Sequence, residues 1–307
     1  MSALGFDTSN YTASAAWTNG KTDKSERQLL PVKEGERGIR QSDGLFHHVK
    51  ILPDLFECLD IDMKNVTAVG VSTRPRNVEG SYMPVFLAGH GFARMAAKTL
   101  GVPLYEFSHQ DGHIMAGIYS CGAYELLEKP FLSVHLSGGT TEILRTEYDG
   151  LGFENEIIGG TKDISAGQFI DRVGVRMGMR FPAGKELEQL ALSSSVGAKL
   201  PISTDDTMVS FSGVETKSAQ IADKTKKEEL ALGVLECVRD TLTKAINNAI
   251  KLTSVRDILI VGGVASNSII RKGFTEKLKG SVYFAKPEYS TDNAVGIAYL
   301  AYLASGK

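Results

Sequence analysis

A two-lobed α/β fold is what this sequence predicts, on three grounds: its length, a repeated strand–turn–strand pattern, and helices that alternate with strands. A chain of 307 residues is too long for a single small core. Strand patterns at Ala3–Phe6 and Thr12–Trp17 flank an acidic, hydroxyl-rich turn, as in a β-hairpin. The same pattern recurs in the second half, where strand patterns at Phe131–Leu136 and Glu142–Glu147 flank a turn rich in serine, threonine and glycine.

The remaining elements follow each hairpin in a similar order. In the first half the patterns predict helix Leu45–Leu59, strand Val66–Ser72, helix Met83–Leu100 and strand Val102–Glu106. In the second half they predict helices Ala166–Met177 and Glu186–Leu192, a loop over Ser193–Phe211, helix Lys226–Leu252, strand Asp257–Val261, a helix from Asn267, strand Val282–Phe284 and helix Asp292–Leu303. Duplicated α/β lobes that each offer a turn to a ligand are typical of the actin-like ATPase fold (ASKHA, ribonuclease H-like). We expect an N-terminal lobe over residues 1–107 and a second lobe over 108–307, with the option that the last helix packs back toward the first lobe.

Composition excludes several classes of protein. The net charge of −2 argues against a surface built wholly to hold nucleic acid, although local basic patches remain open. The three cysteines have no CxxC spacing and indicate free thiols in a reducing compartment. Asp7 interrupts the first apolar stretch, which argues against a signal peptide, and no apolar run is long enough to span a bilayer. We therefore expect a cytoplasmic protein that does not bind membranes.

Two histidines have the spacing of metal ligands. Ser108 has the character of a helix N-cap, and His109 and His113 follow it at positions i and i+4, so both imidazoles lie on one face of the helix. A pair of histidines without any ligand is the alternative. A third ligand must come from elsewhere, because Asp111 faces away from the pair. Asp292 is a candidate, although by sequence alone it is an ordinary acid at the start of the last helix.

Two glycine motifs are candidates for holding a phosphate or a nucleoside. Ser137–Thr140 places glycines and hydroxyls between two strands, although a simple hairpin turn explains the same residues. Gly262–Gly263 joins a strand to the start of a helix, where free amides favour anions. Asp171 lies on a helix after a glycine-bearing loop and can accept both hydroxyls of a ribose. The alternative for Asp171 is a surface ion pair with Arg172 or Arg176.

Several motifs in a fixed order resemble one known family. HxxxH, SGGTTEIL, AGQFIDRVG, FPAGKELEQLA, SFSGVETKSA, VGGVASN and STDNAVGIAY, over about residues 67–302, are similar to the TsaD/Gcp family of tRNA N6-adenosine threonylcarbamoyltransferases, once described as O-sialoglycoprotein endopeptidases. The resemblance implies an actin-like fold and transfer of a threonylcarbamoyl group from threonylcarbamoyl-adenylate to the N6 amine of an adenosine beside the anticodon. A peptidase is disfavoured, because the HxxxH motif lacks the glutamate of HExxH enzymes.

The resemblance also implies roles for particular residues. The metal ligands would be His109, His113 and Asp292, for one iron or zinc ion. An adenine nucleotide, either ATP or threonylcarbamoyl-adenylate, would be held by His135, Leu136, Ser137, Gly138, Gly139, Asp171, Gly184, Glu188 and Asn267. Asp7 and Ser9, in the N-terminal motif, are the catalytic candidates. The implied partners are tRNA and other subunits of the threonylcarbamoyladenosine machinery, among them a paralogous actin-like subunit and a small ATPase.

The chain also departs from the family pattern, chiefly in the first lobe. The family's ETSCDET is DTSNYT from Asp7 to Thr12, so two acids are absent, and its TGPG loop is replaced by STRPR at residues 72–76. SGLKT becomes SGVET, and the histidine of SGGHT is Thr140. The metal and nucleotide positions are kept. These changes indicate a divergent paralogue, and two alternatives follow: a carbamoyl transferase with a different acceptor, or a non-catalytic nucleotide-binding subunit.

Overall fold

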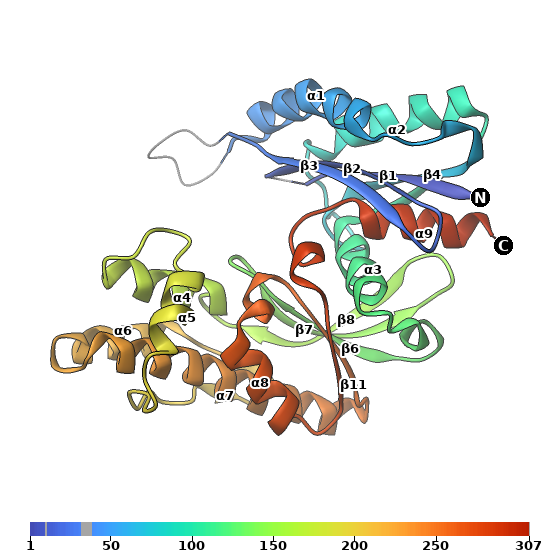
Figure 1. Ribbon diagram of the computed structural model, residues 1–307. Helices are drawn as coiled ribbons and strands as arrows, with labels where there is room; N and C mark the ends of the chain where they lie inside the picture. The colour runs from blue at the N-terminus through green and yellow to red at the C-terminus, as the bar shows by residue number, and fades with distance from the viewer. Residues whose placement is uncertain (10, 32–38, 307) are drawn as a thin grey trace. The chain divides into compact units, whose positions relative to one another are not determined.

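The computed structural model describes residues 1–9, 11–31 and 39–306, which fold into two compact units (Figure 1). Unit 1 contains Met1–Tyr124, Tyr148–Glu154 and the C-terminal segment from Glu288, and unit 2 contains Glu125–Glu147 and Asn155–Pro287. The boundary expected after residue 107 differs from this division. Helix α3 (His109–Cys121) belongs to unit 1, because it packs against the C-terminal helix α9 (Val295–Ser305), which returns to the first sheet.

Unit 1 is built on a sheet whose described strands have the order β3-β2-β1-β4-β5. The strands are β1 (Ser2–Thr8), β2 (Thr12–Thr18), β3 (Asp23–Leu29), β4 (Val66–Arg74) and β5 (Leu104–Ser108). β1, β2 and β3 form an antiparallel meander, whereas β4 and β5 continue the sheet in parallel with β1. The hairpin predicted at the N-terminus is therefore confirmed, and a third strand extends it.

Helices cover both faces of this sheet (Figure 1). α1 (Gln41–Cys58) and α2 (Phe86–Leu100) lie over the face that carries Leu4 and Phe6, and their contacts form the unit's main apolar core. α9 lies on the other face, where glycines permit a close approach. A Cβ atom on Gly5 would lie only 2.5 Å from the carbonyl oxygen of Ala294. α9 can therefore hold its preceding segment firmly against β1 and β2.

Unit 2 contains a second sheet with the order β12-β11-β6-β7-β8-β10-β9 among the described strands. These are β6 (Phe131–Leu136), β7 (Thr141–Tyr148), β8 (Phe153–Thr161), β9 (Thr204–Asp205), β10 (Met208–Val209), β11 (Asp257–Val261) and β12 (Ser281–Phe284). The helices are α4 (Ala166–Arg176), α5 (Gly184–Ala191), α6 (Ser212–Ile221), α7 (Lys227–Thr253) and α8 (Ser268–Lys277). Short 3-10 turns occur at Met63–Asn65, Tyr124–Glu128, Ala222–Lys224, Gly263–Ser266 and Pro287–Tyr289. One apolar core joins the sheet to α4, α5, α7 and α8.

Most predicted elements are present, and the two-sheet α/β architecture is confirmed. Sequence patterns missed β8 and α6, and the predicted loop over residues 193–211 contains the short strands β9 and β10. The last helix begins at Val295 rather than at Asp292. The Asn293 carboxamide accepts a hydrogen bond from the amide of Val295 (3.0 Å), so the chain turns into the helix only after Asp292. No helix in the described part of the chain is both long and apolar enough to cross a membrane.

Candidate functional site

Helix α3 begins with a capping box that sets the direction of its first turn. The Ser108 hydroxyl accepts a hydrogen bond from the amide of Asp111 (3.1 Å), and the Asp111 carboxylate accepts one from the amide of Ser108 (2.9 Å). The Asn77 carboxamide donates to the same carboxylate. Asp111 is thus buried in the cap and does not join the histidine pair, as the sequence predicted.

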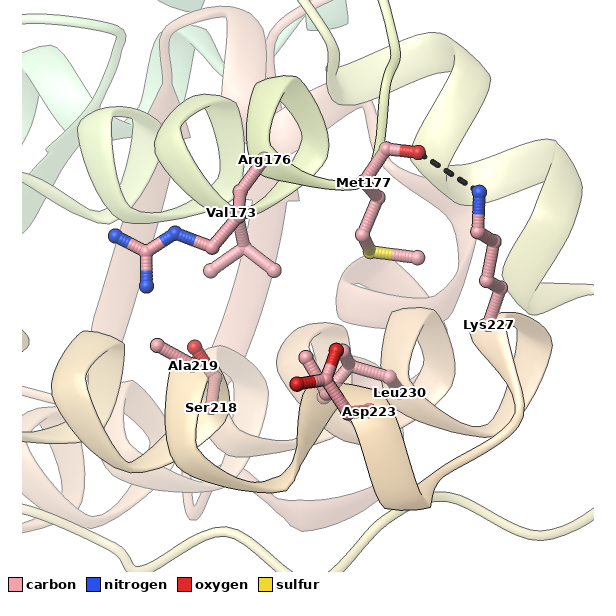
Figure 2. Close-up of a pocket in the computed structure, with 9 residues that line it drawn as sticks. Val173, Arg176, Met177, Ser218, Ala219, Asp223, Lys227 and Leu230 are labelled. Carbon is pink, nitrogen blue, oxygen red and sulfur yellow. Dashed lines mark hydrogen bonds between the residues drawn. The ribbon is translucent and has the colours of Figure 1, made fainter.

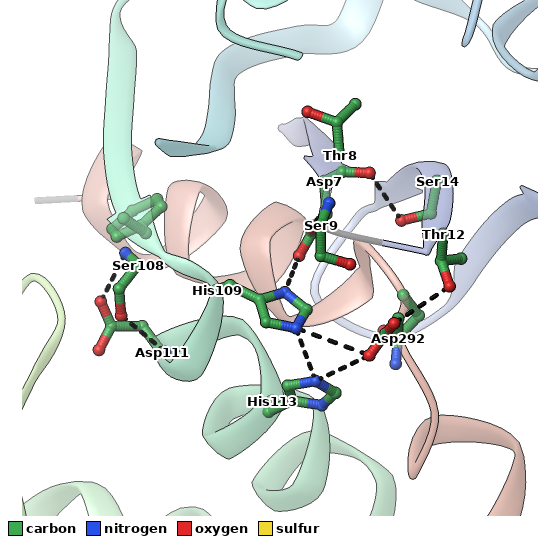
Figure 3. A network of polar contacts seen from close by, with 12 residues as sticks. Asp7, Thr8, Ser9, Thr12, Ser14, Ser108, His109, Asp111, His113 and Asp292 are labelled. Carbon is green, nitrogen blue, oxygen red and sulfur yellow. Dashed lines mark hydrogen bonds and ion pairs between the residues drawn. The ribbon is translucent and has the colours of Figure 1, made fainter. Parts of the chain in front are cut away.

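The two histidines of α3 meet Asp292 in unit 1 (Figure 3). The Nε2 atoms of His109 and His113 are 3.0 Å apart. The Oδ1 atom of Asp292 lies 3.2 Å from Nε2 of His113 and 3.6 Å from Nε2 of His109. Three potential ligand atoms from two separate segments therefore form one small triangle.

This triangle fits a divalent transition metal. Two imidazole nitrogens and one carboxylate oxygen are a donor set that iron(II) and zinc both accept. His109 and His113 would each offer an imidazole nitrogen to such an ion, and Asp292 would offer a carboxylate oxygen. The Asp292 side chain is 33% exposed, so the site is not sealed from solvent.

Two residues beside the β1–β2 turn contact the ligand candidates through atoms outside the triangle. They are Asp7, which contacts His109, and Thr12, which contacts Asp292. Oδ2 of Asp7 lies 2.6 Å from Nδ1 of His109, on the far side of the ring from Nε2. The Thr12 hydroxyl donates to Oδ2 of Asp292 (3.0 Å), which leaves Oδ1 toward the histidines. The amide of Ser9 donates to Oδ1 of Asp7 (2.9 Å), and the buried Ser9 hydroxyl has no hydrogen-bond partner among the described residues. Asp7 and Ser9, predicted to be catalytic, are therefore both beside the metal-ligand candidates.

The charges at this site favour a cation. Burial alone would lower the pKa of His109, but the carboxylates of Asp7 and Asp292 outweigh it and raise the pKa to about 10. Burial would likewise raise the pKa of Asp292, whereas hydrogen bonds from His109 and His113 hold it well below its usual value. Without a metal, protonated His109 offsets part of the negative charge of the two carboxylates. A divalent ion would satisfy the same negative charge.

The glycine motifs of unit 2 converge around the turn that follows β6. The Ser137 hydroxyl accepts from the amide of Thr140 (3.0 Å), so the turn closes on itself. The Ser165 hydroxyl, at the N-cap of α4, donates to the carbonyl of Gly138 (2.7 Å). A Cβ atom on Gly262, which has a φ of +100°, would collide with the backbone of Leu136. The two glycine motifs predicted to act together are thus in contact, with Leu136 buried beneath them.

The other predicted nucleotide residues lie on the helices around this turn. Asp171 on α4 accepts a hydrogen bond from the amide of Ala183 (2.8 Å). Burial raises the pKa of Asp171, although the amides of Ala183 and Gly184 partly oppose this effect. The alternative ion pair of Asp171 is not what the structure contains, because Arg172 lies 3.2 Å from Glu215 and Arg176 3.9 Å from it.

Glu188 and Asn267 are both engaged at the start of α8. Glu188 accepts hydrogen bonds from the amide and the hydroxyl of Ser268 (2.7 and 2.5 Å). The Asn267 carboxamide caps α8 by accepting from the amides of Ile269 and Ile270, both at 3.1 Å. His135 lies on β6, in register with Glu142 of β7 and Val261 of β11. Glu188 and Asn267 together accept hydrogen bonds from the first three amides of α8.

Cavities open on the described part of unit 2. One of about 620 Å³, a size that suits a small-molecule ligand, is lined by Gly138, Gln168, Asp171, Arg172, Val175, Arg176, Phe181 and Glu215. It includes two predicted nucleotide residues, Gly138 and Asp171. A smaller one of about 140 Å³ lies between α4, α6 and α7, where the Lys227 ammonium donates to the carbonyl of Met177 (Figure 2). None of the predicted site residues lines this smaller cavity.

Comparison with known proteins places these features in a family. Residues 46–299 match the model of the TsaD family, described as tRNA N6-adenosine threonylcarbamoyltransferase. The chain is 30% identical to the tRNA N6-adenosine threonylcarbamoyltransferase of Thermosipho africanus, over 98% of this chain and 94% of that protein. The chain belongs to the TsaD family. The resemblance predicted from its motifs is confirmed.

Another relative is similar in sequence, and two solved structures are similar in fold. The enzyme of the same name from Nitrosomonas eutropha is 28% identical over 82% of this chain and 76% of its own length. Component A of (R)-2-hydroxyglutaryl-CoA dehydratase from Acidaminococcus fermentans has a TM-score of 0.59 at 17% identity and covers both chains completely. A glucokinase of the ROK family from Streptomyces griseus has a TM-score of 0.53 at 12% identity, again over both whole chains. At such identities the solved structures support the actin-like fold alone.

One contact of this TsaD-family chain was beyond sequence reasoning. Thr12 binds Asp292 across 280 positions of sequence, and nothing in either segment signals the other. Without knowing that α9 packs on β1, no pattern connects the β1–β2 turn to the C-terminal segment.

Proposed function

We propose that this protein transfers a threonylcarbamoyl group from threonylcarbamoyl-adenylate to the N6 amine of an anticodon-loop adenosine in tRNA, with a metal ion held by unit 1. The observation that carries the proposal is the triangle of His109, His113 and Asp292 in a chain of the TsaD family. In the reaction, the bond between the carbamoyl carbon and the adenylate phosphate breaks and a C–N bond to the amine forms. AMP and one proton leave.

The residues of unit 1 prepare a site for an iron or zinc ion. When bound, such an ion supplies Lewis acidity that polarises the carbamoyl carbonyl. His109 and His113 present their Nε2 atoms to it, and Asp292 presents Oδ1. Asp7 acts through His109 and is a positioning residue in this proposal. The Ser9 hydroxyl stays a candidate for direct contact with the substrate, because it has no hydrogen-bond partner among the described residues.

The residues of unit 2 would hold the adenylate. The small residues of the turn at 137–139 allow close approach of a phosphate, because the space beside Gly138 and Gly139 is open. Asp171 lines the cavity of about 620 Å³, where its free acceptor capacity suits a ribose diol. Gly184, Glu188 and Asn267 keep α5 and α8 in place around the turn. Binding of ATP or of threonylcarbamoyl-adenylate follows from the same frame.

The test is reconstitution with a direct product assay. Purified protein loaded with iron(II) or zinc is given threonylcarbamoyl-adenylate, unmodified tRNA and the other subunits that we propose as partners, a paralogous actin-like protein and a small ATPase. Nucleosides from the digested tRNA are then separated and weighed by mass spectrometry. We expect N6-threonylcarbamoyladenosine with the wild type and at least a hundredfold less with His113→Ala. Unmodified tRNA in both samples contradicts the proposal.

A second candidate is a carbamoyl transferase with a different acceptor. It is favoured by the altered N-terminal motif DTSNYT, in which two acids of the family motif are absent. Release of AMP from the donor that speeds up with a small amine but not with tRNA would support this candidate. Neither AMP release nor tRNA modification would instead support a non-catalytic subunit.

A further inference from the structure

The β1–β2 hairpin contacts two metal-ligand candidates that come from different parts of the chain. Asp7 at the end of β1 reaches His109 of α3, and Thr12 at the start of β2 reaches Asp292, before α9. All four residues belong to unit 1, and Figure 3 shows their side chains directed toward one another. The end of β1 and the start of β2 therefore contact both ligand-bearing segments.

The contact of Asp7 decides which nitrogen of His109 is available. Asp7 is only 1% exposed, and its second oxygen is occupied by the amide of Ser9, so the carboxylate has little freedom to turn. At 2.6 Å it accepts the hydrogen of Nδ1 of His109. Nε2 is then the nitrogen of His109 that faces His113 and would be the one to bind a metal. A carboxylate behind a ligating imidazole commonly orients the ring and increases its basicity.

The hydrogen bond from Thr12 makes the two oxygens of Asp292 unequal, because only Oδ2 accepts it. The hydroxyl is buried and donates to Oδ2, while Oδ1 is the oxygen nearest both histidines. On the next strand, a guanidinium nitrogen of Arg27 donates to the Thr291 hydroxyl (2.6 Å) and to the carbonyl of Glu288 (3.1 Å). The segment before α9 is thus tied to two strands of the meander. Because Oδ2 accepts a hydrogen bond from the Thr12 hydroxyl, Asp292 would offer a metal ion one oxygen, Oδ1, rather than two.

We propose that Thr12 and Asp7 are the positioning residues of this metal site, with Thr12 keeping Asp292 a one-oxygen ligand. A carboxylate that binds through both oxygens would occupy one more coordination position. By holding Oδ2 away, Thr12 leaves that position open for a substrate oxygen. This inference rests on the metal site of the proposed function.

The test compares three variants of threonine residues in the same strand. Thr12→Val removes the hydroxyl at nearly constant shape, and Thr12→Ser restores it. Thr18→Val is the matched control, because Thr18 is also buried on β2 but donates to the carbonyl of Thr22. The full-length protein is stripped of metal, and its affinity for zinc is measured by competition with a coloured chelator. We expect 10- to 100-fold weaker binding for Thr12→Val, and binding within about threefold of wild type for Thr12→Ser and Thr18→Val.

A second readout reports coordination rather than affinity. The visible spectrum of the cobalt(II)-substituted protein depends on the number of ligands, so Thr12→Val should change its band intensities while Thr18→Val does not. Thr12→Ala replaces Thr12→Val if the latter fails to fold. Wild-type affinity and an unchanged cobalt spectrum in the hydroxyl-free variant overturn this inference alone. Failure of the wild type to bind zinc, or equal binding by His113→Ala, overturns the metal site and this inference together.

Discussion

Gly296 of α9 lies directly against the carbonyl oxygen of Gly112 in α3, so closely that a Cβ atom on Gly296 would overlap that oxygen. A Cβ atom on Gly112 would in turn press on the side chain of Ile297. α3 carries His109 and His113, and Asp292 precedes α9 by three residues. The crossing of these two helices at a pair of glycines therefore sets how close the third ligand candidate comes to the first two.

Gly296→Ala should separate the two helices and weaken the metal site. The added methyl group forces α9 away from α3, and we expect a loss of about 2 kcal/mol in unfolding free energy, as for other overpacked cores. Zinc affinity should fall at least tenfold, because Asp292 moves with α9. Gly91→Ala is the control. It lies inside α2, where a Cβ atom meets nothing within 4 Å, and alanine should stabilise the helix by up to about 1 kcal/mol. Equal effects of the two substitutions on zinc affinity would contradict this argument.

His113→Ala should remove the metal while the fold persists. The side chain supplies one of three donors, and the remaining pair is too few for tight binding. We expect close to one metal ion per wild-type chain and less than about a tenth of that in the variant, by elemental analysis of the purified proteins. Circular dichroism checks the fold. His90→Ala, which removes a histidine paired with Glu106 on the same unit, should keep its metal.

Metal binding should release about one proton per ion at pH 8. In the metal-free protein Asp7 and Asp292 outweigh burial and raise the pKa of His109 to about 10, so Nε2 carries a proton that the ion must displace. Affinity should therefore increase with pH up to about 10. The stability of the metal-free protein has the opposite pH dependence. Its ion pairs with His109 contribute fully below about pH 6.5, and this contribution is lost as the pH rises through about 10. Calorimetric titrations in buffers of different ionisation enthalpy measure the proton count. A binding enthalpy independent of the buffer would contradict the expectation.

Local patterns predicted the parts of the site that are close in sequence. The i, i+4 spacing of His109 and His113 and the Ser108 cap are short-range features, and the structure contains both. The strand–turn–strand patterns at residues 2–18 and 131–148 were equally visible, because alternating burial and small polar turns are local properties. The frame around residues 137–139 was predictable only as separate motifs.

The remaining features depend on tertiary contacts or on weak patterns. The start of α9 was misplaced because Asn293, rather than Asp292, binds the first free amide of the helix. α6 was missed because its segment SGVETKSAQI has few apolar residues and buries only Val214 and Ser218. β8 was missed because its pattern of buried and exposed residues does not alternate and it ends in a glycine pair. The return of α9 to β1 was expected only as an option, and the packing of α3 against α9, which places α3 in unit 1, depends on that return.

Asp171→Asn should weaken nucleotide binding with little effect on stability. The carboxamide oxygen can still accept from the amide of Ala183, so the turn before α5 keeps its hydrogen bond. Its other atom is a donor, however, and cannot accept from a ribose hydroxyl. We expect about a tenfold loss of ATP affinity, equivalent to about 1.4 kcal/mol, by calorimetry. Asp223→Asn, at the smaller cavity of Figure 2, should bind ATP as the wild type does. Wild-type affinity in Asp171→Asn would exclude this carboxylate from the nucleotide site.

His48→Leu should stabilise the protein at mildly acidic pH. His48 on α1 is fully buried, and neither ring nitrogen has a hydrogen-bond partner among the described residues. Burial lowers its pKa below 6.5, although the carbonyl of Ser9 and the charge of Asp7 partly oppose this shift. In mildly acidic solution the unfolded chain therefore binds a proton at His48 that the folded chain does not bind. The free energy of unfolding of the wild type falls as the pH drops below about 6.5. Leucine has neither a titrating group nor polar nitrogens to bury. We therefore expect the free energy of unfolding to increase by about 1 kcal/mol at pH 5 and by less at pH 8. Urea unfolding at both pH values measures it, with His47→Leu as the neighbouring control. A variant that loses stability between pH 8 and pH 5 as steeply as the wild type would show that His48 is not the group responsible.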